Sequence, residues 1–287
     1  MFEAALKEMQ QSGQGCWGPR GFQDYCRENG FRAPDTAQFI SVDTRLRLQP
    51  ELVKAECMVF RLGIPEGERN TQFGLAKCVD GWEDYFLLDD WLFRKVPPEM
   101  FLPTAPARHL FPFQLLPTFT ETSLVNLALA SGLMGHALRL EEPDLALAAA
   151  TGQSTLSFQF RPHEQASAVW AHGRGQVEID SLFTARREGR ETVFIVESKA
   201  GAEFDCLAKH KLLYPMLAIR QKVPSYMPVV PVYLRVVKEA DGYHFYFAEC
   251  KLELGKDGVA VLSNLKPVVM SHFVIGLFQW SAECSRV

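Results

Sequence analysis

The chain has 287 residues, of which 47% are hydrophobic and 22% are charged, and its formal net charge is −4. This length supplies enough material for one large domain or two modest ones, and the composition is that of an ordinary globular protein. The negative charge excludes a polybasic protein that coats nucleic acid, although a specific enzyme can still gather its basic residues in one cleft. No apolar run approaches the roughly 20 residues that span a bilayer. The acidic, polar N-terminus is also unlike a signal peptide, so we expect a cytoplasmic protein without membrane contacts.

The cysteines and histidines lack the spacing of a metal knuckle. Seven cysteines run from Cys16 to Cys284 without a Cys-x-x-Cys pair, which predicts reduced, mostly buried thiols rather than a disulfide framework. The seven histidines show no paired ligand spacing, which argues against a zinc site or an HNH-type nuclease.

The N-terminal third of the chain has the pattern of a small α+β unit. A helix is predicted over residues 19–29, ended by Gly30. Runs that alternate in polarity predict strands of an antiparallel sheet, the last two joined by a turn at Asp80-Gly81. These runs lie near residues 37–42, 54–62, 72–79 and 83–88. We therefore predict an N-terminal α+β domain over residues 1–95, with a role in DNA recognition or dimerisation.

Residues 96–117 hold six prolines. Proline fixes φ and lacks an amide donor, so this segment predicts a stiff connector rather than a regular element. The interspersed apolar residues, among them Phe101 and Leu110, indicate that the connector packs against the rest of the chain.

The remaining residues, 118–287, predict a second domain. Thr120 can cap a long apolar helix over about 121–139. Further elements are predicted as strands at 155–160, 176–185 and 191–198, a helix at 203–221, and strands at 228–237 and 243–252. The apolar tail over 267–280 is left unassigned, with a core strand favoured over an interface. This order predicts an α/β fold in which a mixed central β-sheet is flanked by helices.

A hairpin in this domain carries the chemically informative residues. Two apolar, β-branched runs flank a polar turn near Gly189, and pairing them brings Asp180 close to Glu197. Side chains alternate along a strand, so Lys199 shares the face of Glu197, and Glu178 shares the face of Asp180.

Two carboxylates and a lysine suit metal-dependent phosphodiester hydrolysis. Mg²⁺ prefers hard oxygen ligands and keeps several waters, so Asp180 and Glu197 suffice as protein ligands, with the backbone carbonyl of Ser198 as a third. Mn²⁺ is a possible substitute. Lys199 can then orient and help to deprotonate the attacking water and offset charge on the phosphate.

The tripeptide Glu197-Ser198-Lys199 is not specific by itself. An acidic residue two positions before a lysine is expected about once or twice by chance in a chain of this composition. A second case, Glu249-Cys250-Lys251, follows a strand without a carboxylate. The alternative for Asp180, Glu197 and Lys199 is a cross-strand ion pair on a solvated sheet face. The apolar neighbours of both acids weigh against it, because unpaired buried acids are costly.

Over about residues 120–252 the chain resembles the PD-(D/E)XK nuclease superfamily. Asp180 stands at the motif aspartate, with Ile179 in place of the preceding proline, and Glu197 and Lys199 match the (D/E)XK pair. The resemblance implies a restriction-endonuclease-like core in which the two acids bind metal and Lys199 assists the water. The segment Lys211-Leu-Leu-Tyr-Pro-Met is similar to a Gln-Leu-Tyr-Tyr-Pro segment of several members, which implies that Lys211 borders the site. Many members also carry a glutamate on the first helix, for which Glu121 is the candidate.

Basic residues cluster in sequence around this motif and are candidates for phosphate contacts. They are Arg161, Arg174, Arg186 and Lys209. We therefore expect a Mg²⁺-dependent restriction-type endonuclease that acts on double-stranded DNA as a homodimer. The alternatives are a recombination or repair nuclease of the same fold, and a non-catalytic DNA-binding or assembly protein on a nuclease scaffold.

Overall fold

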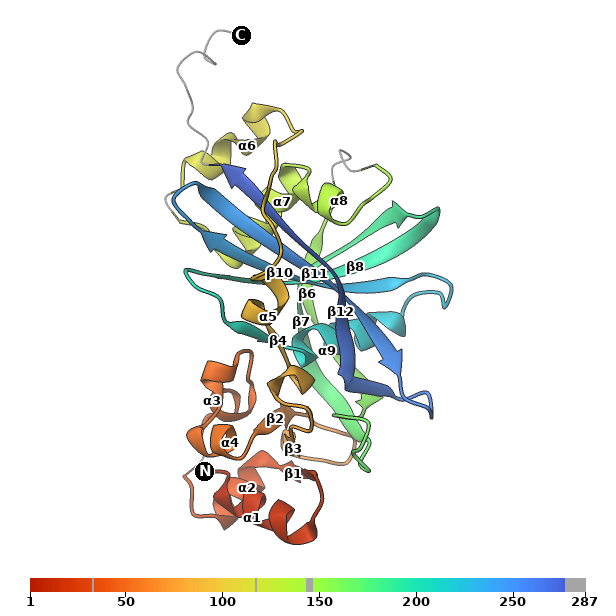
Figure 1. The fold of residues 1–287 in the computed structure, drawn as a ribbon. Coiled ribbons are helices and arrows are strands. Elements are labelled where there is room, and N and C mark those ends of the chain that lie inside the picture. The colour runs from red at the N-terminus through yellow and green to blue at the C-terminus, as the bar shows by residue number, and fades with distance from the viewer. Residues whose placement is uncertain (33, 117, 143–146, 277–287) are drawn as a thin grey trace.

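A computed structural model describes residues 1–32, 34–116, 118–142 and 147–276, and Figure 1 shows its arrangement. Its centre is a seven-stranded mixed sheet in the order β5-β12-β11-β10-β8-β7-β6. The strands are β5 (Glu99–Met100), β6 (Ala150–Phe160), β7 (Trp170–Arg187), β8 (Arg190–Gly201), β10 (Val229–Lys238), β11 (Gly242–Leu254) and β12 (Ala260–Gly276). β10 runs parallel to β8, and β5 runs parallel to β12, whereas the other neighbours are antiparallel. The predicted mixed α/β fold with a large central sheet flanked by helices is confirmed.

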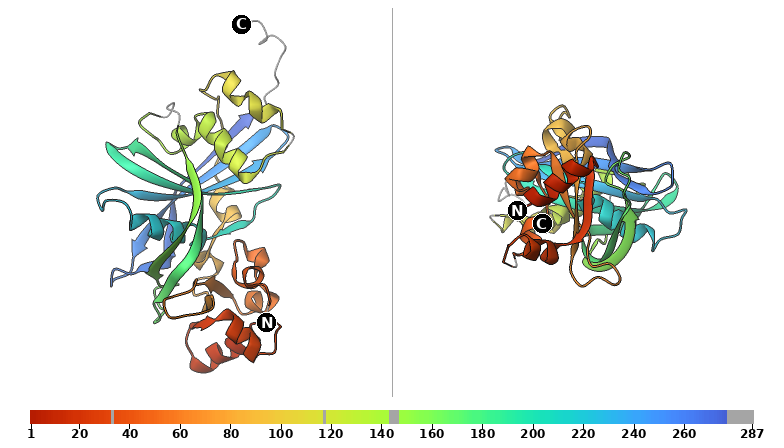
Figure 2. Two further views of the ribbon diagram at one scale, coloured as in Figure 1. Left: turned by 180° about the vertical axis from the view of Figure 1, so that it is seen from behind. Right: turned by 90° about the horizontal axis from the view of Figure 1, so that it is seen from below.

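Both faces of the central sheet are covered. Along β8, Phe194 and Val196 enter one hydrophobic cluster with helices α7 (Glu121–Ala130) and α8 (Leu133–Ala137). Ile195, between them, enters a second cluster with α9 (His210–Arg220). Figure 2 shows the sheet between these helices. The period of two along the strand therefore assigns alternate β8 residues to opposite layers.

The N-terminal part builds a three-stranded sheet in the order β1-β3-β2, with short helices around it. Its elements are α1 (Glu3–Ser12), β1 (Cys16–Gly21), α2 (Phe22–Glu28), α3 (Thr36–Ile40), η1 (Arg45–Arg47), α4 (Pro50–Lys54), β2 (Cys57–Arg61), β3 (Gln72–Lys77), η2 (Trp82–Asp84), β4 (Phe86–Leu88) and α5 (Asp89–Phe93). The strands predicted near 54–62 and 72–79 are confirmed. The strand predicted at 37–42 is wrong: the segment is helix α3, which Asp35 caps by accepting from the Ala37 amide.

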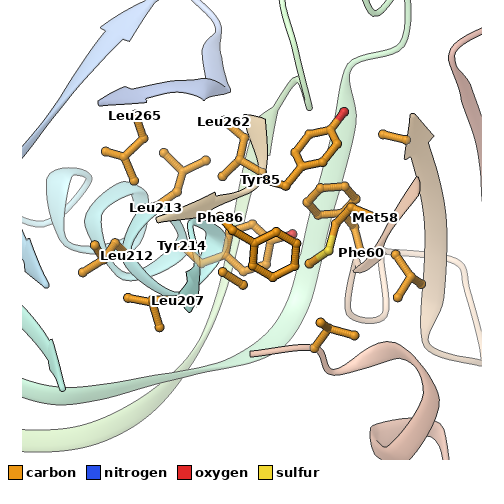
Figure 3. Close-up of a cluster of buried hydrophobic side chains, with 14 of the residues drawn as sticks. Met58, Phe60, Tyr85, Phe86, Leu207, Leu212, Leu213, Tyr214, Leu262 and Leu265 are labelled. Carbon is orange, nitrogen blue, oxygen red and sulfur yellow. The ribbon is translucent and has the colours of Figure 1, made fainter. Parts of the chain in front are cut away.

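The N-terminal elements share a core with the rest of the chain. β4 does not pair with β3, as the predicted turn at Asp80-Gly81 implied, but with β9 (Cys206–Ala208). Figure 3 shows Met58 and Phe60 packed with Tyr214 of α9 and Leu262 of β12. These residues belong to one continuous hydrophobic cluster. A division of the chain into domains at 96–117 stays a prediction.

The proline-rich segment is more regular than predicted. It contains β5 and helix α6 (Ala107–Gln114), with Pro112 inside the helix. Phe101 and Leu110 are buried, so the segment packs down as expected. Pro97, Pro98, Pro103 and Pro106 lie before or between these two elements and interrupt neither, whereas Pro112 removes an amide donor within α6.

The predicted elements of the C-terminal part are present with changed bounds. The side chain of Thr120 caps α7 by accepting from the Ser123 amide at 3.2 Å. The helix ends at Ala130 rather than near 139 because Gly132 adopts a φ of +82°. β12 accounts for the apolar tail up to Gly276, and residues 277–280 lie outside the described residues. The six cysteines in the described part, all but Cys284, are free and buried. No helix of that part is long and apolar enough to cross a membrane.

Candidate functional site

The β7–β8 hairpin that carries the motif forms as predicted. Its strands pair from Arg187–Arg190 to Ser181–Val196. The two turn residues, Glu188 and Gly189, have φ values of +53° and +72°. Positive φ at both central positions is the geometry of a two-residue type I′ turn, whose twist suits a hairpin. This turn fixes the register that places Asp180 near Glu197.

Asp180 lies at an irregularity of β7. Against β6, Leu182 pairs with Ala150, but Ile179 pairs with Gly152. Two steps along β6 therefore match three steps along β7, so β7 carries one extra residue at Asp180-Ser181. A bulge bends the strand and redirects the side chains next to it. The bulge marks the point at which β7 stops pairing with β8.

The carboxylate of Asp180 binds the main chain of the motif. Beyond the Ser181–Val196 pair, the Ser198 amide donates to Asp180 Oδ2 at 3.1 Å, and the Ser198 hydroxyl lies 3.4 Å from the same oxygen. Asp180 is half-buried, whereas Ser198 is buried. The aspartate thus holds the amide that lies between Glu197 and Lys199.

Glu197 is the most deeply buried acid of the site. Its side chain is 4% exposed, and its Oε1 lies 3.8 Å from the ammonium groups of both Lys199 and Lys211. Burial raises the pKa of Glu197 to about 8; the two lysines oppose the shift, while Asp180 and Glu121 add to it. The loss of hydration therefore outweighs two nearby cations.

Glu121 joins this group from α7. Its Oε2 lies 3.4 Å from Lys199 Nζ, and its Oε1 accepts from the Ala200 amide at 3.1 Å. Burial alone would lower the pKa of Lys199, but Glu197 and Glu121 outweigh it and raise the pKa. Lys199 is thereby held as a cation at the end of β8.

Lys211 joins the group from the first turn of α9. It lies 4.0 Å from Glu178 as well as 3.8 Å from Glu197. The structure therefore gathers all six acids and lysines that the sequence singled out around the motif. They are Glu121, Glu178, Asp180, Glu197, Lys199 and Lys211.

A cavity of about 310 Å³ opens beside this group, between α9, β7 and the N-terminal unit. Glu178 and Lys211 belong to its wall, so the cavity and the candidate site are continuous. The N-terminal unit contributes the other cations and an acid. The lining residues are Ala37, Ser41, Val42, Asp43, Arg47, Arg61, His172, Gln176, Val177, Glu178, His210, Lys211, Tyr214 and Pro215.

The residues predicted to contact phosphate are not gathered in one place. Arg174 is exposed on β7, two residues from Gln176 of the cavity wall. Arg161 is paired with Asp257 at 2.7 Å, and Arg186 is paired with Glu141 near the hairpin turn. Lys209 is 1% exposed and donates to the Ser263 carbonyl at 3.3 Å. Burial, with Lys266 nearby, lowers the pKa of Lys209 to about 7. Lys209 therefore has no surface on which to meet a phosphate.

The second tripeptide, Glu249-Cys250-Lys251, has different surroundings. Glu249 is buried, but Arg187 and Arg139 approach its carboxylate at 2.7 and 3.6 Å. Lys251 is exposed. Two guanidinium groups thus hold this glutamate in a structural ion pair, whereas Glu197 has acidic neighbours and a raised pKa.

The sequence reading missed the contribution of the N-terminal unit. Arg61 donates to the Ser41 hydroxyl at 3.2 Å and lines the cavity. Asp43 also lines the cavity and is one of the acids that raise the pKa of Lys199. No local pattern marks these residues, because they reach the site only through contacts between segments more than 100 residues apart in sequence.

The comparison with known proteins gives a family without a described activity. A family described as "Domain of unknown function (DUF6997)" matches residues 104–254. The match contains the whole candidate site but not the N-terminal wall of the cavity. No curated protein and no solved structure matches the chain.

Proposed function

The chain belongs to the DUF6997 family, and we propose that its site is the catalytic centre of a Mg²⁺-dependent, restriction-type endonuclease for double-stranded DNA. The observation that carries this proposal is the buried carboxylate of Glu197, which lies beside Asp180 and between Lys199 and Lys211. A structural ion pair on a solvated sheet face does not require a side chain that is 4% exposed with a strongly raised pKa.

The topology supports the resemblance to PD-(D/E)XK nucleases. After α7, the strands β6, β7 and β8 lie side by side, α9 crosses the sheet, and β10 joins parallel to β8. A four-stranded mixed sheet between helices is the core that the resemblance implies. The proposal is that this part of the seven-stranded sheet is a restriction-endonuclease-like core.

The donor atoms fit a hard divalent cation. The ligands would be the carboxylates of Asp180 and Glu197 and the carbonyl of Ser198, all oxygen donors of the kind that Mg²⁺ prefers. A cation would also remove the reason for the raised pKa of Glu197, since it offsets the charge that burial disfavours. When bound, Mg²⁺ polarises the phosphoryl oxygen and makes its water more acidic.

The chain's own residues have separate tasks in this proposal. Lys199 orients the attacking water and offsets charge on the phosphate. Glu121 positions Lys199, because it holds both the ammonium group and the adjacent Ala200 amide. Lys211 lies beside Glu197 and Glu178. From this position its ammonium group can contact a phosphate oxygen of the DNA.

The cavity is the proposed path of the DNA backbone into the site. Arg61 and Lys211 line it, and Arg174 is exposed nearby, so three cations from separate elements can contact consecutive phosphates. Arg161 and Arg186 are paired elsewhere, and Lys209 is buried, so these three are left out of the proposed contact surface. A homodimer would bring two such sites to the two strands of a duplex.

Incubation of plasmid DNA with Mg²⁺ and the wild-type protein, Asp180→Ala or Lys199→Ala tests the proposal. Discrete fragments from the wild type that are lost in both variants support a restriction-type nuclease. Cleavage of branched substrates alone would replace it with a recombination or repair nuclease. Binding without cleavage, unchanged in both variants, would replace it with a non-catalytic scaffold.

A further inference from the structure

The turn between β10 and β11 and the start of β11 hold a second group of ligand side chains. Glu239, Asp241 and His244 each offer one atom, and these atoms lie within 4.8 Å of one another. Within the described ranges, no other group of three His, Cys, Asp or Glu residues does so. His244 Nε2 lies 2.8 Å from Asp241 Oδ1 and 3.8 Å from Glu239 Oε2.

A second histidine fixes the orientation of this group. His244 Nδ1 lies 2.9 Å from His272 Nε2, and His272 Nδ1 lies 3.4 Å from the Val96 carbonyl. Both histidines are 7% exposed. A carbonyl only accepts, so His272 Nδ1 must carry the proton of that contact.

The two ring nitrogens of His244 face different partners. Nε2 faces the carboxylates of Glu239 and Asp241, and Nδ1 faces His272. A metal ion on Nε2 leaves the ring proton on Nδ1, from which it can be donated to His272 Nε2.

We propose that Glu239, Asp241 and His244 bind one divalent transition-metal ion of the Zn²⁺ class, and that His272 positions His244. One imidazole nitrogen and two carboxylate oxygens are three protein ligands, which leave a fourth position for water. Metal-binding histidines commonly have their second ring nitrogen held by another group, as His272 holds His244 here. All three ligands lie within residues 239–244, but the paired spacing of histidines and cysteines did not reveal them, because His244 is the only histidine among them.

This site is distinct from the proposed nuclease centre. Lys199 pairs with Arg235 across β8 and β10, and Glu239 follows four residues later. At about 3.3 Å per residue, the step along the strand is roughly 13 Å. The ion would join the β10–β11 turn to β12 through His272, and the inference does not depend on the nuclease proposal.

Titration of the chelator-treated full-length chain with Zn²⁺, followed by calorimetry, tests the proposal. The titration uses an Asp180→Asn, Glu197→Gln background, so that the nuclease site contributes no ligand. One Zn²⁺ per chain is expected, and Glu239→Gln with Asp241→Asn, or His244→Gln alone, should weaken binding at least about tenfold. Glu253→Gln, which removes an exposed carboxylate elsewhere on β11, is the matched control.

His272→Phe separates positioning from ligation. It keeps an aromatic ring beside Tyr246 but removes the acceptor for His244, so affinity should fall about 10- to 100-fold while the stoichiometry stays at one. Circular dichroism verifies that each variant is folded. Absence of Zn²⁺ binding by the parent chain, or binding that His244→Gln leaves unchanged, would overturn the site. Binding unchanged in His272→Phe would overturn the positioning role.

Discussion

The Ser198 amide donates to the carboxylate of Asp180 at 3.1 Å, which ties the two halves of the motif together. The bulge in β7 lets Asp180 reach the next strand instead of continuing the ladder. The contact fixes the main chain at Ser198, between Glu197 and Lys199.

Replacement of Arg61 by Met should weaken DNA binding in a salt-dependent way. Each phosphate contact that is lost lowers the slope of log affinity against log salt concentration by about 1. The expected change is therefore a smaller slope, measured by fluorescence anisotropy on a duplex. Arg220→Met removes an exposed charge at the far end of α9 and should leave the slope unchanged. Equal slopes for Arg61→Met and wild type would remove Arg61 from the contact surface.

Glu121→Gln should change the protonation of Lys199. The amide can still accept from Ala200, but the negative charge that helps to raise the pKa of Lys199 is gone. The high-pH limb of the cleavage profile should therefore move to lower pH. An unmoved limb would show that Glu121 does not act through Lys199.

Glu197→Gln should stabilise the metal-free protein most at high pH. The pKa of Glu197 is about 8 in the folded state against an ordinary value of 4.5, so the folded state binds this proton more tightly. The free energy of unfolding of the wild type therefore falls progressively from about pH 4.5 to 8, and this loss is constant above that range. The gain in Glu197→Gln is bounded by about 5 kcal/mol, at about 1.4 kcal/mol per pKa unit. Urea unfolding at pH 5 and pH 9 measures it, and an equal difference at both values would contradict the raised pKa.

Phe60→Ala should destabilise the whole chain in one step. Phe60 is 1% exposed and contacts Tyr85, Phe160 and Trp170, so it joins the N-terminal unit to the central sheet. Such a truncation typically costs about 3–5 kcal/mol. Hydrogen exchange should show β2 and β8 losing protection at the same urea concentration. Loss in β2 while β8 stays protected would show that residues 1–95 unfold as a separate domain.

The sequence predicted best what depends on local pattern. The hairpin followed from alternating strands and a turn at Gly189, and α7 followed from the cap at Thr120. The β4–β9 pair and the role of Arg61 were missed because they depend on contacts between distant segments. The bulge was missed although the alternation breaks there, since Asp180 and Ser181 are consecutive polar residues between Ile179 and Leu182, which pack against the same cluster.

Glu249-Cys250-Lys251 was not predicted to be a metal site, because the strand before it carries no carboxylate that could complete the site. Its glutamate is paired with Arg187 and Arg139, and neither arginine could be assigned to it from spacing. The central sheet therefore carries one Glu-x-Lys tripeptide in the candidate site and one in a structural ion pair, so the effects of replacing their lysines can be compared in the same protein.

The most direct test of the central claim compares Lys199→Met with Lys251→Met in Mg²⁺-dependent plasmid cleavage. Both changes remove the lysine of a Glu-x-Lys tripeptide, and only Lys199 lies beside Glu197 and Glu121. Lys199→Met should lower the cleavage rate at least about 100-fold, whereas Lys251→Met should cleave at the wild-type rate. Equal rates for the two variants, or wild-type cleavage by Lys199→Met, would show that Lys199 is not part of a catalytic centre.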